Sequence, residues 1–151
     1  MNNLVTDDTL DTSFSALYDA TRGRKFYWVR ANRAIAKDNP YPVIFDEGGY
    51  VTVATDAAAY VAGARVWVGV AESTAASGEV VKMQVGGLRD GVVLPASVTP
   101  TDSTRGIAYN TSAVIGVYKV TDIRVWGVAR DNVAGDTRSL YLTGEEVVGN
   151  V

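Results

Sequence analysis

The sequence predicts an all-β protein, either an antiparallel β-barrel or a β-sandwich of about nine to ten short strands with an extended N-terminal arm. Short runs of β-branched and aromatic residues recur at a spacing of roughly 8–12 residues, and clusters of Gly, Pro, Asn and Asp separate them. No two of these runs are separated by a helical pattern long enough for a parallel crossover. Hydrophobic residues make up 47% and charged residues 21% of the 151 residues, a balance typical of one domain with a full core.

Residues 1–21 differ from the rest of the chain, because they show neither strand alternation nor a long helical face. Only Ser13–Ala20 could form one or two helical turns, capped by Thr12 or Ser13. The segment carries six sizeable apolar side chains, Leu4, Val5, Leu10, Phe14, Leu17 and Tyr18. Since such side chains gain free energy by docking, we expect an extended arm over residues 1–21, with simple terminal disorder as the alternative, and a single β-domain over residues 22–151.

Charge is divided unevenly along the first part of the chain. Residues 1–21 hold four acids and no base, whereas residues 22–37 hold six bases and no acid, and the whole chain carries −3. This division indicates a polar contact between the arm and a partner or sister subunit, although a solvated tail beside charged strand ends gives the same pattern. The residues that we expect at such an interface are Leu4, Leu10, Phe14, Leu17, Tyr18, Arg22, Arg24 and Lys25.

The first half of the domain contains three predicted strands. The run Phe26–Ala31 is rich in strong β-formers, and Tyr41–Phe45 follows the turn 38–40. Because Pro42 cannot donate to a ladder, its strand is expected to be an edge strand or to begin there. The turn 46–49 predicts a hairpin into the strand 50–54, and residues 55–63 could form a short helical turn.

The second half is more regular. In Arg65–Ala71 the valines Val66, Val68 and Val70 share one face, as in a strand. Strands over 79–85 and 92–94 follow, and then a loop rich in Ser, Thr and Pro over residues 95–106. The remaining predicted strands are 107–109, 113–120, 123–129 and 139–143.

One stretch is repeated within the chain, because Arg65–Ala71 resembles Arg124–Ala129 with one residue deleted. A small-residue loop that ends in Gly and an acid follows each copy. We interpret the pair as two similar hairpins, each with an outward-leaning Trp beside a Gly. A duplicated binding site is the alternative.

Composition excludes several classes of catalytic site. The chain has no Cys and no His, so it cannot form a disulfide, a thiol nucleophile, a Cys/His zinc site or a His-based triad. The adjacent acids Asp46-Glu47 and Glu145-Glu146 do not make a catalytic pair, because neighbouring strand residues point to opposite faces. No phosphate-binding loop, nucleophile elbow or EF-hand pattern is present. We therefore expect neither an enzyme nor a cofactor.

The sequence also bears on partners. A net charge of −3 and a sequence pI near 4.9 argue against nucleic-acid binding. No apolar stretch approaches the roughly 18 residues of a membrane span, and the first residues lack a signal-peptide pattern. Trp28, Trp67 and Trp126, with the eight Tyr, could line a sugar-binding face, although packing is the more common role of strand aromatics.

Residues 66–95 carry short motifs in a characteristic order. The strand end Val68–Glu72 is followed by the small-residue loop Ala75–Gly78, the valine-rich strand Glu79–Val85, Gly86-Gly87 and finally Gly91–Pro95. This order resembles that of small capsid decoration (cement) proteins of tailed bacteriophages. A looser similarity, which includes the later Ile115–Val117, extends to about residue 120.

The resemblance implies a non-enzymatic structural protein. It would be made in the host cytoplasm, bind the major capsid protein on the outer surface of the virion and stabilise the head. It also implies a β-rich body, a homotrimer, and neither a membrane nor a nucleic-acid partner. No family site residue carries over, because the matching motifs are turns and core. The alternative function is a carbohydrate- or receptor-binding β-module of a phage tail or fibre.

Overall fold

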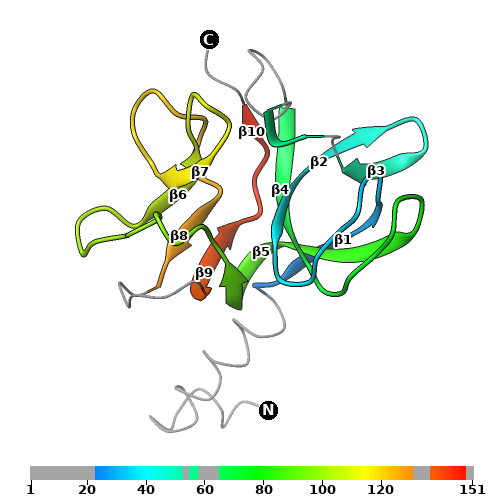
Figure 1. The fold of residues 1–151 in the computed structure, drawn as a ribbon, viewed down its shortest axis with the longest axis horizontal. Helices are drawn as coiled ribbons and strands as arrows, with labels where there is room; N and C mark the ends of the chain where they lie inside the picture. The colour runs from blue at the N-terminus through cyan, green and yellow to red at the C-terminus, as the bar shows by residue number, and fades with distance from the viewer. Residues whose placement is uncertain (1–22, 53–54, 58–64, 131–136, 149–151) are drawn as a thin grey trace, which may run out of the picture.

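The computed structural model describes residues 23–52, 55–57, 65–130 and 137–148 (Figure 1). The predicted arm, and the predicted interface residues Leu4, Leu10, Phe14, Leu17, Tyr18 and Arg22, lie outside this part of the chain. The described residues form ten strands, which confirms the predicted all-β class and strand number. These are β1 (Lys25–Arg30), β2 (Pro40–Asp46), β3 (Gly49–Thr52), β4 (Arg65–Ala71), β5 (Val80–Val93), β6 (Gly106–Tyr109), β7 (Ile115–Val117), β8 (Gly127–Ala129), β9 (Thr137–Thr143) and β10 (Val147–Val148).

Five strands close into a small barrel in the order β4-β2-β3-β1-β5, because β5 also pairs with β4. The barrel is mixed, since β1 pairs with β3 in parallel through Val29 and Tyr50. The expectation of purely antiparallel strands is therefore wrong at this pair. The sequence predicted no helix that could connect two parallel strands, and the connection from β1 to β3 contains none. The chain returns along β2, which pairs with β3 and β4 rather than with β1.

The expectation that Pro42 marks an edge strand is also wrong. Strand β2 lies inside the barrel wall between β4 and β3. Pro42 opposes Val68 of β4, whereas pairing with β3 among the described residues starts only at Val43.

Two loops cross one end of the barrel and are bonded to each other reciprocally. The loop after β1 and the loop after β4 meet at a bridge between Ile35 and Ala75, whose N–H groups donate to each other's carbonyl oxygens. Farther out, the Gly78 N–H donates to the Ala31 oxygen, and the Asp38 N–H donates to the Ala71 oxygen. Ala31 and Ala71, Ile35 and Ala75, and Asp38 and Gly78 thus occupy equivalent positions, and the two residues of each pair are 40 apart in the sequence. The segments β1–β2 and β4–β5 are therefore two copies of one strand–loop–strand unit.

Strand β5 joins the barrel to a second sheet. Its first part pairs with β1, and its second part pairs with β9 from Gly86 to Val93. The predicted strands 79–85 and 92–94 are thus parts of one strand, and the prediction of two was wrong. Gly87, with φ of 84°, lies where the partner changes, and a Cβ there would come 2.2 Å from the Gly23 oxygen.

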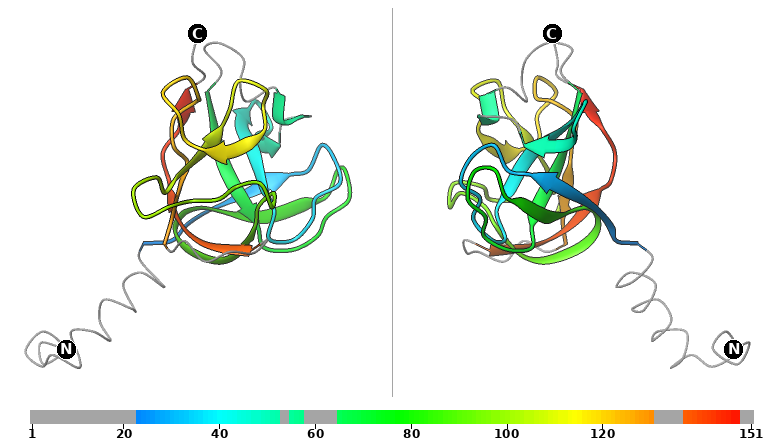
Figure 2. Two further views of the ribbon diagram at one scale, coloured as in Figure 1. Left: turned by 60° about the vertical axis from the view of Figure 1, so that its left-hand side comes forward. Right: turned by 90° about the vertical axis from the view of Figure 1, so that its right-hand side faces the viewer.

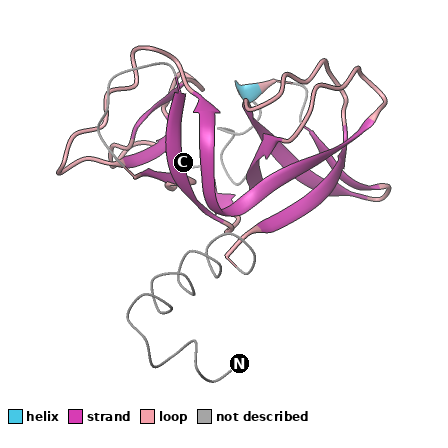
Figure 3. Cartoon of the chain, turned by 90° about the horizontal axis from the view of Figure 1, so that it is seen from below, coloured by secondary structure: helices cyan, strands magenta, loops and turns pink. Residues whose placement is uncertain are grey.

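The second sheet continues from β5 in the order β9-β8-β6-β7 and lies to the left of the barrel in Figure 1. Viewed from below, the two groups of strands diverge from the region where they meet (Figure 3). Strands β7 and β8 are shorter than the predicted 113–120 and 123–129. Strand β10, which pairs with β4 through Val147 and Val66, was not predicted.

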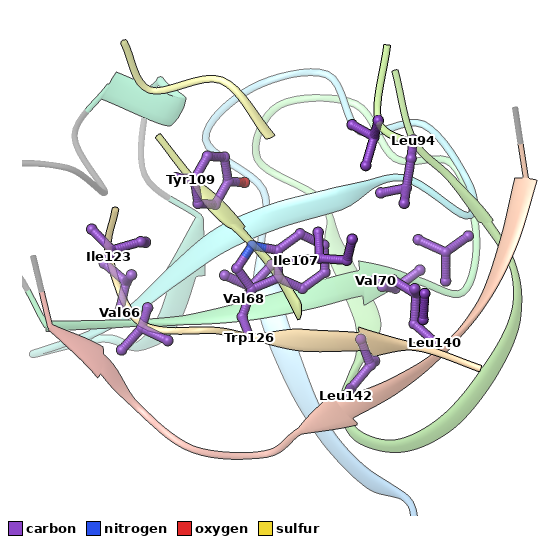
Figure 4. Packing of buried hydrophobic residues seen from close by; sticks show 14 residues of the cluster. Val66, Val68, Val70, Leu94, Ile107, Tyr109, Ile123, Trp126, Leu140 and Leu142 are labelled. Carbon is purple, nitrogen blue, oxygen red and sulfur yellow. The ribbon is translucent and has the colours of Figure 1, made fainter. Parts of the chain in front are cut away.

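Strand β4 separates two hydrophobic cores. Val66, Val68 and Val70 face a core between the barrel and the second sheet, which also contains Tyr109 and Trp126 (Figure 4). The opposite face lines the barrel interior, whose buried residues are Val29, Ala31, Ile35, Val43, Ala71, Val81 and Met83. The predicted common face of the three valines is confirmed.

The interpretation of the repeated stretch as two hairpins with outward tryptophans is wrong. Trp126 is fully buried in the core between barrel and sheet. Trp67 is half-buried and packs against the barrel core. Only the first copy is a full strand, since β8 begins after Trp126. The similarity reflects the alternation common to strands that are buried on one side.

Candidate interaction surfaces

The outer wall of the barrel exposes an apolar and basic surface, here called the barrel face, made of Phe26, Trp28, Arg30, Val80 and Lys82. Its two strands, β1 and β5, lie side by side in the right-hand view of Figure 2. Register pairs Trp28 with Lys82 and Arg30 with Val80, so these side chains share one side of the sheet. Their neighbours Val29 and Val81 point into the barrel.

Two large apolar side chains of the barrel face are open to solvent. Trp28 is 67% exposed and Val80 is 62% exposed. Lys82 lies over the half-buried ring of Phe26, with 4.4 Å between Nζ and the ring centre. An exposed Trp beside a second exposed apolar residue is unusual on a free surface and typical of binding surfaces.

The barrel face carries excess positive charge. Arg30 pairs with Asp46 at 3.6 Å, while Lys82 contacts a ring rather than a carboxylate. Glu79 precedes Val80, but its Oε2 accepts a hydrogen bond from the Ala76 N–H at 2.7 Å. Arg24, just before β1, is exposed. The surface therefore suits an apolar partner with acidic groups.

The second sheet exposes an uncharged surface, here called the sheet row, made of Leu88, Tyr118, Val125, Val128 and Tyr141. Cross-strand pairs run from Leu88 to Tyr141, from Tyr141 to Val128 and from Val128 to Gly106. A Cβ at Gly106 would meet Val125 at 2.9 Å and Tyr118 at 3.3 Å, so these two side chains complete the row.

The sheet row faces away from the core, because the alternate residues Leu140 and Leu142 of β9 are buried beneath it. Tyr141 is 42% exposed, and Val128 is 37% exposed. The row crosses several strands without a charged member. Such a flat apolar stripe can bury a large area against another protein, but it offers no group for chemistry.

Four aromatic rings gather at one mouth of the barrel. Tyr27 and Tyr50 stack with 3.9 Å between ring centres, Trp67 meets both edge-on, and Phe45 meets Tyr50 edge-on at 5.1 Å. The hydrogen bond between the tyrosines and partial burial raise the pKa of Tyr50. Since these rings pack against one another, they close the barrel rather than form an open platform.

The three tryptophans do not share a surface. Trp28 lies on the barrel face, Trp67 at the barrel mouth and Trp126 in the core. A sugar-binding face built from all three is therefore not formed.

Two grooves, one in the second half and one between residues of both halves, present no reactive cluster. One of about 480 Å³ runs beside β7, between Ile115 and the loop that holds Ser97 and Thr99. A smaller one, of about 320 Å³, lies near Arg33 and Tyr41. Among the described residues, no group of three acids or other ligands is placed to hold a metal ion. No described helix is long and apolar enough to cross a membrane.

Two of the predicted interface residues fall in the described part of the chain. Arg24 is exposed at the edge of the barrel face. The Lys25 Nζ donates to the Gly144 oxygen at 3.4 Å and lies 5.1 Å from the centre of the Tyr27 ring, so it is engaged within its own chain. Trp28, Val80 and Lys82 were not predicted as site residues, although period-two alternation in 26–30 and 80–84 separates them from the core positions.

No protein-family model and no curated protein matches the chain. One solved structure, "The crystal structure of head fiber gp8.5 N base in bacteriophage phi29", is partly similar. The two chains share 10% sequence identity with a TM-score of 0.49, over 82% of this chain and 97% of that chain. A similarity at this level carries no functional conclusion for this chain.

Proposed function

We propose that this protein is a structural component of a tailed-phage virion, a capsid decoration protein that binds the major capsid protein on the outer surface of the head and stabilises the shell. It acts without catalysis and without a cofactor. The proposal also includes a homotrimer as the working state and residues 1–21 as a docking arm.

The observation that carries the proposal is that the sequence resemblance falls on one structural unit. Residues 66–95 cover β4 from Val66 onward, the loop after it and all of β5. Through β5 this unit connects the barrel to the second sheet. The matching glycines include Gly87, which has positive φ and lies at the junction. The resemblance thus covers the segment that sets the shape of the whole domain rather than scattered turns.

The exposed surfaces fit a protein that works by contact. The sheet row is broad, apolar and uncharged, which suits a lasting protein interface. We assign the capsid contact to this row. The other exposed apolar surface, the barrel face, is basic and is left for a different partner. Many copies on one shell multiply a modest contact into a large total stabilisation.

The test introduces one charge into the sheet row. Tyr141→Asp places an unpaired carboxylate at the centre of the row, while the exposed position leaves the fold intact. Co-sedimentation with particles that lack the protein should show binding weakened by at least about tenfold. Phe45→Asp, at the barrel mouth and 66% exposed, is the matched control and should bind like the unaltered protein. Equal binding by the Tyr141 variant would refute the assignment of the capsid contact.

A further inference from the structure

We infer that the barrel face is the docking surface for residues 1–21 of a second copy of this chain. The inference builds on the proposed homotrimer and names the contact that would hold it together. It does not depend on the capsid as a partner.

The first argument is complementarity of charge. Residues 1–21 carry Asp7, Asp8, Asp11 and Asp19 and no base. The barrel face offers Lys82, which has no carboxylate partner among the described residues, and Arg30, whose pair with Asp46 is long and half-exposed. Arg24 adds a third cation beside the face. An acidic segment is thus attracted to this wall of the barrel, whereas the uncharged sheet row offers it nothing.

The second argument is apolar content. Six apolar side chains are spaced through residues 1–21, from Leu4 to Tyr18. Trp28 and Val80 supply the exposed apolar surface that such side chains can cover, and Trp28 is the type of residue that dominates binding energy when it is buried at an interface. The same partner therefore satisfies both the cations and the exposed apolar side chains of the face.

The third argument is the direction of the chain, which favours a second copy over self-docking. Strand β1 is antiparallel to β5, with Lys25 opposite Gly86 and Arg30 opposite Val80. Gly23 and Arg24, the described residues just before β1, lie against Gly87 at the far end of this pairing from Val80. The chain is therefore moving away from Val80 as it leaves the barrel. Folding back would require a reversal, whereas reaching a neighbour would not. In the proposed homotrimer this head-to-tail contact, repeated about a three-fold axis, closes into a ring.

The experiment measures the mass of the full chain in solution without capsids, by light scattering over a concentration series up to about 100 µM. The unaltered chain should exceed the 16.1 kDa of a monomer. Trp28→Ala and Lys82→Glu should each weaken association by at least about tenfold, and added salt should weaken it further. Phe45→Ala, an equally exposed aromatic at the barrel mouth, should associate like the unaltered chain.

A charge exchange identifies the arm as the occupant. Asp8→Lys with Asp11→Lys should weaken association, and combining both with Lys82→Glu should restore a large part of it. A chain that stays monomeric at every concentration would overturn the inference, since the face would then hold its own arm or another protein. Unchanged association of Trp28→Ala would overturn it as well. Because no capsid is present, either failure leaves the capsid-binding test of Tyr141→Asp standing.

Discussion

Asp38 and Gly78 occupy equivalent positions in the two barrel loops, and both have positive φ, 65° at Asp38 and 94° at Gly78. Glycine adopts this conformation without steric cost, whereas a residue with a Cβ does not. Asp38 adopts positive φ although it has a Cβ, and its carboxylate accepts a hydrogen bond from the Arg89 Nη2 at 2.5 Å. Arg89 also pairs with Glu72, so one largely buried guanidinium ties both loops to β5.

We therefore expect Asp38→Ala to be more destabilising than Asp38→Gly. Both variants lose the ion pair, but only alanine retains the strain of positive φ, about 1–2 kcal/mol. Gly78→Ala measures the strain of positive φ without an added steric clash, because nothing lies within 4 Å of a Cβ at Gly78. Denaturant unfolding should show that the difference between the two Asp38 variants matches the loss in Gly78→Ala within about 0.5 kcal/mol. Equal stabilities for the two Asp38 variants would contradict this account.

The junction between barrel and second sheet should not tolerate a side chain at Gly87. A Cβ there would lie 2.2 Å from the Gly23 oxygen and 2.8 Å from the Arg24 Cα, both backbone atoms that cannot rotate away. Gly91→Ala is the matched control, since Gly91 also has positive φ and nothing lies within 4 Å of its Cβ position. Gly87→Ala should lower the free energy of unfolding by at least about 2 kcal/mol more than Gly91→Ala. Similar losses would mean that residues 23 and 24 shift at little cost.

Tyr109 should make stability fall at alkaline pH. Burial, reinforced by the negative charge of Asp56 and partly offset by Arg33, raises the pKa of Tyr109 well above its usual value. Above about pH 10 the unfolded chain loses this proton while the folded chain keeps it, so the free energy of unfolding falls as pH rises. Tyr109→Phe should flatten this slope in urea unfolding measured between about pH 9 and 11. Tyr118→Phe, at an exposed position, should leave it unchanged.

Tyr109→Phe should not destabilise the protein at neutral pH. The Tyr109 hydroxyl is buried and has no hydrogen-bond partner among the described residues. Removing an unsatisfied buried hydroxyl costs nothing in hydrogen bonding and can stabilise. A clear loss of stability at pH 7 would indicate that the hydroxyl has a partner in the folded protein.

The proposed function predicts a difference between complete and depleted particles. Particles without this protein should lose packaged DNA or shell integrity at a lower temperature than complete particles, because each bound copy stabilises the assembled shell. Heating in parallel with a DNA-binding dye measures the release temperature, and adding back purified protein should restore it. Identical release temperatures in all three samples would remove the stabilising role.

Period-two alternation made much of the fold predictable. The alternation of Val66, Val68 and Val70 identified a strand and its buried face, and the turn at 46–49 identified a hairpin. The absence of Cys and His excluded several chemistries on composition alone. The charge division between residues 1–21 and 22–37 predicted a contact near β1, but it did not single out Trp28 or Lys82, which the proposed docking surface adds.

Local patterns in the chain were enough to predict the β class, most of the strands and the buried face of strands such as β4, because side-chain alternation and turn chemistry are local properties. What covers each outward face depends instead on the tertiary arrangement. Trp28 and Trp126 both lie in runs rich in valine or aromatic residues, yet one is open to solvent and the other is buried beneath the second sheet. The Gly86-Gly87 pair has the composition of a strand end. In the structure β5 continues through it, because its partner changes there from β1 to β9. Exposure and pairing depend on segments far apart in the chain, which no local pattern specifies.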